Sequence, residues 1–325
     1  MHVQAIRAQE NTLLAGVYDH LPEMAAQKAV LYQTRCYPSY EDLLADPAVD
    51  AVAICTPSGL HAQQALQALD AGKHVLIEKP IALNLTDSDR ISEKVREKKL
   101  LVSVVSQLRF SQAVIETKKD LEAGRLGRIV SADLYMKYHR PQSYYDQTGW
   151  RGTFAMDGGG ALMNQGIHGV DLLSYLLGPL HSITAHARTL TRQIEVEDTL
   201  AAVVSFRSGA LGVIQATTSV FPGFPRRLEI NGDKGSIMIV EDTVTRRVIL
   251  GEPEMEEAGP DSRHQGHNNP MQISAAGHIA QYKNFLAAIR KEAPLLVDDQ
   301  DGRRALEIIV KAYESSRDNR IVYFP

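Results

Sequence analysis

The first hundred residues alternate short, continuous apolar runs with segments of helical periodicity. The apolar runs predict strands at 13–19, 50–57, 74–80 and 100–106, and the segments between them predict helices at 22–30, 61–72 and 87–99. Buried strands that alternate with helices are typical of a parallel sheet covered on both faces. Ligands of such open sheets bind beyond the carboxyl ends of the strands. Those ends carry Asp19, Thr56, Glu78, Lys79 and Gln107, so this edge of the sheet is a candidate site.

The pattern changes after about Phe110. The remaining predicted elements are a helix at 111–123, a strand at 127–140, a helix at 160–177, alternating segments at 182–190, 199–220 and 226–243, helices at 275–291 and 301–317, and a strand at 320–325. Turn residues in SFRSGALG and EINGDKGSI stand between strand patterns, as in β-hairpins. We expect a mobile loop at 252–274, which has no period. The predicted fold class is α/β, with a parallel sheet followed by a second, mostly antiparallel sheet.

Composition and charge narrow the class of protein. A chain of 325 residues, 44% hydrophobic and 23% charged, is long enough for two globular domains. The net charge of −4 gives no support for binding to nucleic acid or to a membrane surface. No apolar run reaches the ~20 residues of a membrane helix. Cys36 and Cys55 have neither a disulfide framework nor metal-ligand spacing, which predicts a cytoplasmic protein without a metal site.

The stretch GKHVLIEKPIAL (72–83) places Glu78 and Lys79 directly after a buried strand. Pro80 biases Lys79 toward an extended conformation, and its peptide bond can also be cis. A lysine held at this edge can donate a hydrogen bond to a substrate hydroxyl, and burial lowers its pKa. A plain surface ion pair at the end of the strand is the alternative.

The stretch DGGGALMNQGIHGVD (157–171) starts with three glycines, which allow close approach of the backbone before a helix begins. Asn164, His168 and Asp171 are spaced four and three apart and share one face of that helix. Histidine is suited to general-base catalysis near neutral pH. The alternative is a helix histidine bonded to a backbone carbonyl. The neighbouring glycines and amides favour a site.

Three further stretches carry weaker signals. TPSGLH (56–61) joins a strand to a helix, whose free N–H groups can bind a phosphate or ribose, or it is an ordinary turn capped by Ser58. Trp150 and Arg151 lie in a polar, tyrosine-rich loop and can stack on a ligand or simply pack. Asp19 can accept hydrogen bonds from ribose hydroxyls or act as a cap. The other histidines form no metal-ligand pattern.

Taken in order, these stretches resemble the glucose–fructose oxidoreductase/inositol dehydrogenase family (Gfo/Idh/MocA). The resemblance rests on VAICTPSGLHAQQALQALDAGKHVLIEKPIAL, SQLRF, WRG, DGGGALMNQGIHGVDLLSYLLG, EVEDTLAAVVSFRSGALG and RRLEINGDKGSI, and on the closing HIAQYKNFLAAI and DGRRALEIIVKAYESS. It covers nearly the whole chain. The order and spacing of the motifs make it more specific than any single motif.

The resemblance implies two domains and a redox activity. The first, 1–107, would be a Rossmann domain that binds NAD, with NADP possible. The second, 108–325, would be an α/β domain whose large, open sheet packs against another subunit in a homodimer or homotetramer. Hydride would pass between the cofactor and a carbinol carbon of a sugar, cyclitol or related compound. Two alternatives stay open: a regulatory homologue that binds without turnover, and a reductase of another small carbonyl compound.

The resemblance also implies roles for individual residues. Lys79 matches the lysine of the family's E-K-P motif, and His168 matches its proton-transferring histidine. Asn164 stands where inositol-dehydrogenase-like members carry an aspartate, which puts a Lys–Asp–His relay in doubt; an Asn–His variant occurs among sugar-nucleotide members. The expected cofactor contacts are Asp19, Thr56, Pro57, His61, Glu78, Lys79, Gln107, Trp150 and Arg151. The expected substrate contacts are Lys79, Arg109, Tyr145, Asn164 and His168.

The N-terminal stretch MHVQAIRAQENTLLAGVYD begins inside a helix. Members of the family usually start with an apolar strand and a glycine-rich turn, which is roughly 20 residues more in a βαβ unit. We therefore expect that Met1 is not the natural start. We also expect two strand edges without ladder partners, and weak cofactor binding by the chain as it stands.

Overall fold

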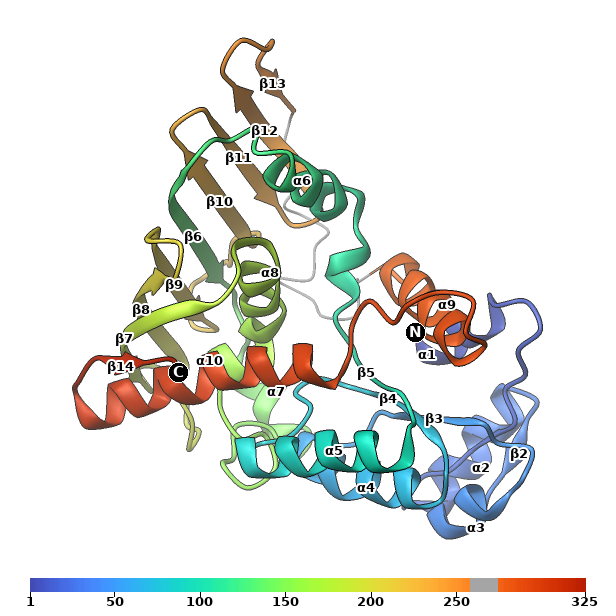
Figure 1. The fold of residues 1–325 in the computed structure, drawn as a ribbon. Coiled ribbons are helices and arrows are strands. Elements are labelled where there is room, and N and C mark those ends of the chain that lie inside the picture. The colour runs from blue at the N-terminus through green and yellow to red at the C-terminus, as the bar shows by residue number, and fades with distance from the viewer. Residues whose placement is uncertain (258–273) are drawn as a thin grey trace.

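The computed structural model describes residues 1–257 and 274–325. Residues 258–273, most of the loop predicted at 252–274, lie outside the described residues. Figure 1 shows two sheet regions side by side, with the smaller one formed by the N-terminal half of the chain. The chain has an α/β fold, as predicted from the alternation of apolar runs and helices.

The N-terminal half contains two parallel sheets. One has the order β3-β4-β5 and the other pairs β1 with β2. The strands are β1 (Gly16–Val17), β2 (Arg35–Cys36), β3 (Ala51–Ile54), β4 (His74–Ile77) and β5 (Val102–Val104). No strand among the described residues joins the two sheets. The apolar pattern predicted four of these strands, while β2 is short and exposed and has no apolar signature.

Helices cover these sheets, and α2, α4 and α5 correspond to the helices predicted at 22–30, 61–72 and 87–99. They are α1 (His2–Arg7), α2 (Pro22–Leu31), α3 (Tyr40–Ala45), the 3₁₀ turn η1 (Ser58–Leu60), α4 (His61–Asp70) and α5 (Leu85–Lys98). Helix α5 shows why the charged segment is helical. The Asn84 side chain accepts a hydrogen bond from the Asp87 N–H at its start, and Lys99 ends it in the left-handed conformation.

The C-terminal half is built on a nine-stranded sheet of order β13-β12-β11-β10-β6-β9-β8-β7-β14. Its strands are β6 (Ile129–Lys137), β7 (Leu180–Arg188), β8 (Thr199–Phe206), β9 (Leu211–Thr217), β10 (Arg227–Gly232), β11 (Gly235–Val240), β12 (Thr243–Ile249), β13 (Met255–Glu256) and β14 (Val322–Tyr323). The predicted hairpins β8–β9 and β10–β11 are confirmed. The sheet is mixed rather than purely antiparallel, because β6 and β9 run parallel.

The later helices tie the two halves together. They are η2 (Gln107–Phe110), α6 (Gln112–Glu122), α7 (Gln142–Asp146), the π-helical η3 (Ala161–Gly166), α8 (Ile167–Leu177), α9 (Ala276–Ile289) and α10 (Asp299–Asp318). In Figure 1, α8 and α10 lie against one face of the large sheet. Helix α9 returns to the N-terminal half and packs on α1 and η2. The predicted domain boundary at residue 107 lies at the start of η2.

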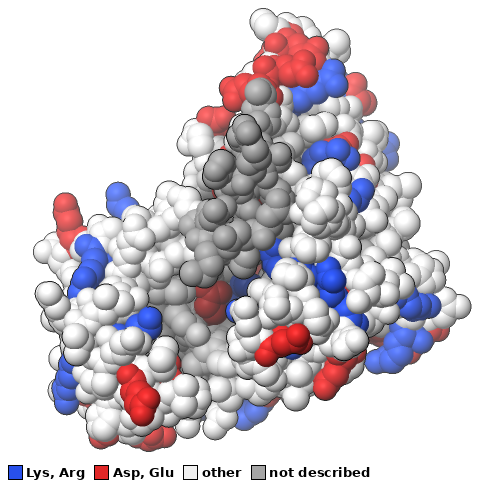
Figure 2. All heavy atoms as spheres, turned by 180° about the vertical axis from the view of Figure 1, so that it is seen from behind, with Lys and Arg blue, Asp and Glu red and all other residues white. Residues whose placement is uncertain are grey.

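The surface carries charges of both signs. Figure 2 shows acidic side chains gathered at the tip of the large sheet, where β13 and the glutamates around it lie. Elsewhere on that face, basic and acidic side chains are interspersed. Within the described residues, no helix combines the length and apolarity that crossing a bilayer requires.

Candidate active site

Lys79 leaves the carboxyl end of β4 and reaches the first turns of the helix that follows the glycine run. Its Nζ donates to the backbone carbonyl of Asn164 at 2.7 Å and lies 3.5 Å from the Asn164 Oδ1. The Lys79–Pro80 peptide is cis, one of the two conformations that the sequence left open. Burial lowers the pKa of Lys79, while the charge of Glu78 opposes that shift. The ammonium has three N–H donors, so donors remain for a ligand oxygen.

Asn164 and His168 are carried by η3 and α8, which run on from one another. The Asn164 Nδ2 donates to Asp157 Oδ1 at 2.5 Å, and the Gln165 amide donates to Asn164 Oδ1 at 3.0 Å. These bonds hold the Asn164 side chain between Asp157 and Lys79. One turn later, His168 makes no hydrogen bond to any described residue. Burial and the nearby charge of Lys79 lower the His168 pKa to about 3, so the ring is neutral and can accept a proton.

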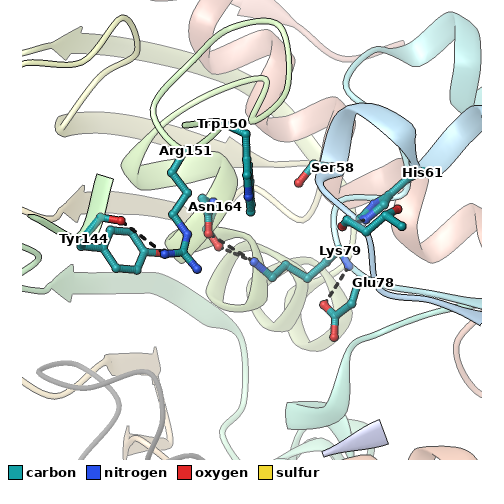
Figure 3. A pocket seen from close by; sticks show the side chains of 9 residues that line it. Ser58, His61, Glu78, Lys79, Tyr144, Trp150, Arg151 and Asn164 are labelled. Atoms are coloured by element: carbon teal, nitrogen blue, oxygen red, sulfur yellow. Dashed lines mark hydrogen bonds between the residues drawn. The ribbon is translucent and has the colours of Figure 1, made fainter. Parts of the chain in front are cut away.

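A cavity of about 190 Å³ lies between these elements. Figure 3 shows Ser58, His61, Glu78 and Lys79 on its N-terminal side and Tyr144, Trp150, Arg151 and Asn164 facing them from the C-terminal half. Thr56 completes the lining. The Arg151 guanidinium stacks on the Tyr144 ring, 4.3 Å from its centroid. Among the described residues, neither Lys79 nor Arg151 forms an ion pair with a carboxylate, so the cavity presents two cations to a ligand.

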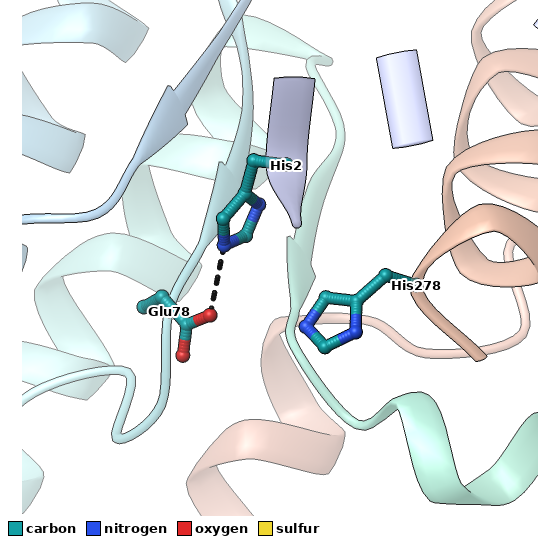
Figure 4. Close-up of side chains that lie close together, drawn as sticks. All are labelled: His2, Glu78 and His278. Carbon is teal, nitrogen blue, oxygen red and sulfur yellow. Dashed lines mark hydrogen bonds and ion pairs between the residues drawn. The ribbon is translucent and has the colours of Figure 1, made fainter. Parts of the chain in front are cut away.

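Glu78 is neutralised from behind by His2. The His2 Nε2 lies 2.9 Å from Glu78 Oε1 (Figure 4), and its Nδ1 lies 2.9 Å from the Tyr282 hydroxyl. Burial alone would lower the His2 pKa, but the hydrogen bonds to Cys55 and Glu78 raise it to about 10. Burial would raise the Glu78 pKa, but His2 and Lys79 lower it to about 2. The pair is therefore an imidazolium–carboxylate ion pair that joins α1 to the residue before Lys79.

His278 lies next to this pair, and the three side chains form a cluster. The spacing of histidines along the chain did not indicate this cluster. The His278 ring meets the His2 ring edge-on at 5.5 Å, and His2, Glu78 and His278 offer ligand atoms within 4.8 Å of one another. Both nitrogens of a protonated His2 carry hydrogen, and each already faces an oxygen atom. We therefore interpret the cluster as an ion pair packed against a buried imidazole.

Replacing His2 by glutamine should destabilise the protein in a pH-dependent way. The contribution of His2 is complete below its unfolded pKa of 6.5 and is lost as pH rises through about 10. The contribution of Glu78 is present above 4.5 and is lost toward pH 2. Urea unfolding should therefore show the largest difference from the wild type, roughly 1–3 kcal/mol, between pH 4.5 and 6.5.

The matched control is His20→Gln, because His20 forms an exposed pair with Asp19 at 3.1 Å. Exposed pairs contribute about 0–1 kcal/mol. A His2→Gln effect as large near pH 10 as at pH 6.5 would contradict the ion pair.

The other predicted cofactor residues lie around this cavity or near the ends of parallel strands. His61 lines it and contacts the backbone oxygens of Pro80 and Thr56 at 2.7 and 2.9 Å, and Pro57 precedes η1. Asp19 follows β1, outside the lining, where one carboxylate oxygen accepts the Leu21 N–H and the side chain is 43% exposed. Gln107 is buried in η2, and its Oε1 has no hydrogen-bond partner in the described structure.

Two predicted substrate residues lie elsewhere. The Arg109 guanidinium is buried in a two-pronged ion pair with Asp171 and contacts Asp301 at 2.9 Å, because α8 and α10 converge on η2. Arg109 therefore lies outside the cavity lining, and we propose a structural role for it. Tyr145 is buried, and its hydroxyl is bonded to Thr218 at 2.8 Å.

Two lining residues were missing from the predicted site. Tyr144, next to Tyr145, is the residue whose ring lines the cavity, and Ser58 lines it as well as starting η1. The sequence signal for Ser58 was its place in the turn after a buried strand. For Tyr144 the signal was the tyrosine-rich loop, which does not distinguish it from its neighbour.

Comparison with known proteins matches both halves of the chain to one family. Residues 1–106 match the oxidoreductase-family NAD-binding Rossmann fold, and residues 118–324 match the C-terminal α/β domain of the same family. The chain belongs to the GFO/IDH/MocA oxidoreductase family. A GFO/IDH/MocA Rossmann domain binds NAD(P), and buried Gln107 Oε1 and half-exposed Asp19 leave oxygen atoms for such a ligand.

Similar proteins of the GFO/IDH/MocA family include an inositol dehydrogenase and two dehydrogenases solved with a sugar nucleotide. Myo-inositol 2-dehydrogenase of Thermotoga maritima is 26% identical over 99% of this chain and 94% of its own. The WlbA dehydrogenases of Chromobacterium violaceum and Bordetella pertussis, both solved with NADH and UDP-GlcNAcA, are 34% and 32% identical. Their TM-scores are 0.89 and 0.88, and the matches cover all of this chain and 92% and 94% of theirs.

The protein is thus an NAD(P)-dependent oxidoreductase acting on a CH–OH group of a sugar, cyclitol or sugar derivative. This supports the catalytic interpretation of the sequence rather than the regulatory alternative. The resemblance noted from its motifs is confirmed by both domain matches.

Proposed function

We propose that the protein oxidises a hydroxyl of a nucleotide-linked, acidic sugar, with Lys79 and His168 acting on the reacting oxygen. The observation that carries this proposal is the charge of the cavity. Glu78 is neutralised by His2, while Lys79 and Arg151 face the cavity without carboxylate partners among the described residues. Such a cavity favours an anionic ligand. The asparagine at 164 and the two WlbA complexes support the same substrate class.

The roles of the residues follow from their protonation and contacts. Lys79 is anchored on the Asn164 carbonyl and directs its remaining N–H donors at the substrate oxygen. The neutral His168 ring accepts the hydroxyl proton, and general-base catalysis of this kind raises the reaction rate by about 10²–10⁴-fold. Asn164, held by Asp157, orients the substrate. NAD, when bound, accepts the hydride that leaves the carbinol carbon.

The cofactor would be held at the sheet edge and the adjoining cavity wall. Asp19 offers a carboxylate oxygen to ribose hydroxyls, which favours NAD over NADP. Thr56, Pro57, His61, Glu78 and Gln107 follow the ends of the parallel strands, and Trp150 lines the same cavity as His61 and Glu78.

We also propose a homodimer or homotetramer formed through the large sheet. Alternate residues of β8 are buried under the helices, whereas Val203 on the other face is 59% exposed and Leu211 on β9 is 58% exposed. An uncovered sheet face with large apolar side chains suits packing against a second subunit. Free Cys36 and Cys55, both exposed, support a reducing compartment such as the cytoplasm.

Arg151→Leu tests the substrate class. The arginine should contribute a charge-assisted hydrogen bond to the anionic group, worth about 1.5–3 kcal/mol, so the KM for a UDP-hexuronate should rise roughly ten- to hundredfold. The KM for myo-inositol, which has no anionic group, should change little. Initial rates of NAD reduction across UDP-hexuronates, UDP-hexoses and inositols measure both.

The matched control is Arg192→Leu, since Arg192 lies outside the cavity lining and Arg151 within it. A rise in the KM for NAD alone would assign Arg151 to the cofactor. Turnover of inositols with no UDP-sugar activity would refute the acidic-sugar substrate.

A further inference from the structure

Glu197 contacts the end of the glycine run and is not one of the residues that line the cavity. It precedes β8, is 8% exposed and contacts the first turn of η3 from outside that helix. Its Oε2 accepts the Gly160 N–H at 2.8 Å and its Oε1 accepts the Leu162 N–H at 2.9 Å. Its backbone carbonyl accepts the Ala161 N–H at 2.9 Å. One residue therefore binds three successive N–H groups at the start of the helix.

These contacts replace a local helix cap. The first N–H groups of a helix have no partner within it and need one from elsewhere. The residue before η3 is Gly160, which offers no side chain. A carboxylate at this end also interacts favourably with the helix dipole. Glu197 supplies from a distant part of the chain what Ser, Thr, Asp or Asn usually supplies locally.

Tyr313 on α10 completes the arrangement. Its hydroxyl donates to Glu197 Oε1 at 2.9 Å. Two glycines of the DGGG run pack too closely against these groups to carry a side chain. A Cβ on Gly160 would lie 1.7 Å from the Glu197 carbonyl oxygen, and a Cβ on Gly159 would lie 2.4 Å from the Tyr313 hydroxyl. The run is therefore needed for close packing against Glu197 and Tyr313.

The held turn leads directly to the reacting groups. Asn164 is two residues beyond Leu162, and its backbone carbonyl accepts a hydrogen bond from Lys79. His168 lies one helical turn further along the chain. We infer that Glu197, supported by Tyr313, is a positioning residue that sets the place of Asn164 and His168 against Lys79. This inference rests on the proposed roles of those three residues.

The charge state of Glu197 should control how firmly the turn is held. Burial raises its pKa to about 7, although the bonds from Leu162, Tyr313 and Gly160 oppose that shift. From α10, the titratable side chain of Tyr313 faces Glu197. From η3, backbone N–H groups face Glu197. Above this pKa the carboxylate accepts all its hydrogen bonds. Below it, one oxygen carries a proton and accepts less well.

Positioning and global stability then respond to pH in opposite directions. The folded pKa of Glu197 lies above its unfolded value of 4.5, so the folded state binds the proton more tightly and stability falls as pH rises from 4.5 to about 7. Positioning improves as pH rises through about 7, because the ionised form holds η3. A residue that served only stability would not raise kcat as stability falls.

The experiment compares Glu197→Gln with the wild type on the active substrate. A glutamine keeps one acceptor oxygen but turns an NH₂ group toward a backbone N–H. We expect kcat to fall by up to about 10²-fold, the loss that an error of about 1 Å in position can cause, with the KM for NAD unchanged. The wild-type kcat should rise through about pH 7, and the variant should lack that inflection.

Tyr313→Phe is the second variant, and it keeps the test decisive if Glu197→Gln does not fold. Losing the hydroxyl removes a hydrogen bond that stabilises the charged carboxylate, so the kcat inflection should move to higher pH. Ser315→Ala is the matched control, because Ser315 is a buried hydroxyl on the same helix that bonds Ala185 and Arg320 instead. It should change stability without moving the inflection.

Hydrogen exchange separates this inference from the proposed function. Protection factors for amides 160–166, corrected for intrinsic exchange, should fall below about pH 7 in the wild type and be low at all pH values in Glu197→Gln. This readout needs no substrate, so inactivity toward every sugar tested would refute the proposed function alone. Unchanged protection in Glu197→Gln, or an unmoved inflection in folded Tyr313→Phe, would overturn the inference.

Discussion

Replacing His168 by asparagine should lower kcat by about 10²–10⁴-fold, the contribution of a positioned general base. The ring is held neutral by burial and by the charges of Lys79 and Arg226, which keep its pKa near 3, so it is available as a proton acceptor throughout the working range. Asparagine is similar in size but cannot take up the proton. Steady-state rates with saturating NAD and substrate measure the loss.

His278→Asn is the matched control for that substitution. His278 is another buried histidine, 6% exposed, and its ring packs edge-on against His2. Its replacement should change kcat no more than a few fold. A His168→Asn enzyme that turns over at nearly the wild-type rate would remove His168 from the mechanism. An inflection of kcat near neutral pH would not come from His168, because burial holds its pKa near 3.

Lys79→Met should lower kcat/KM by about 10²–10³-fold, comparable to the loss of one donor to a developing oxyanion. Methionine preserves most of the side-chain length and removes both the charge and the N–H donors. The ammonium that donates to the Asn164 carbonyl at 2.7 Å would otherwise stabilise negative charge on the substrate oxygen as its proton leaves. Product formation at limiting substrate measures kcat/KM directly.

Lys73→Met provides the comparison for Lys79→Met. Lys73 is also largely buried, at 8% exposure, and its Nζ also donates to a backbone carbonyl, that of Asp46 at 2.9 Å. It lies outside the cavity lining. If both substitutions reduced kcat/KM equally, the effect of Lys79 would come from lost packing rather than from catalysis.

Hydrophobic periodicity was enough to predict the order of layers. Continuous apolar runs identified β3, β4 and β5, and turn residues identified the hairpins β8–β9 and β10–β11. It did not predict β2 or α3, because a two-residue exposed strand and a six-residue helix leave little pattern. The parallel pairing of β6 with β9 depends on contacts between distant segments, which periodicity does not contain.

The site was predictable where its residues follow strand ends or share a helix face. Lys79 and Asn164 meet across 85 residues of chain, as their two motifs together suggested. Arg109 shows the limit: it lies in a motif, but its partner Asp171 is 62 residues away and nothing local indicates the pairing. Tyr144 and Tyr145 are adjacent, so their sequence context does not decide which of the two lines the cavity.

Helix α9 has a consequence for how this chain can be cut, exchanged or synthesised. It closes the N-terminal core around Ala5, Leu76 and Val105 with Tyr282 and Phe285, and Gln281 bonds Ser106 from 175 residues downstream. A chimera that took residues 1–107 from another family member would bring these surfaces from two different proteins. The donor's helix α9 should therefore be included with its first 107 residues. During translation, the apolar surface that α9 covers stays exposed until residues 276–289 have been synthesised.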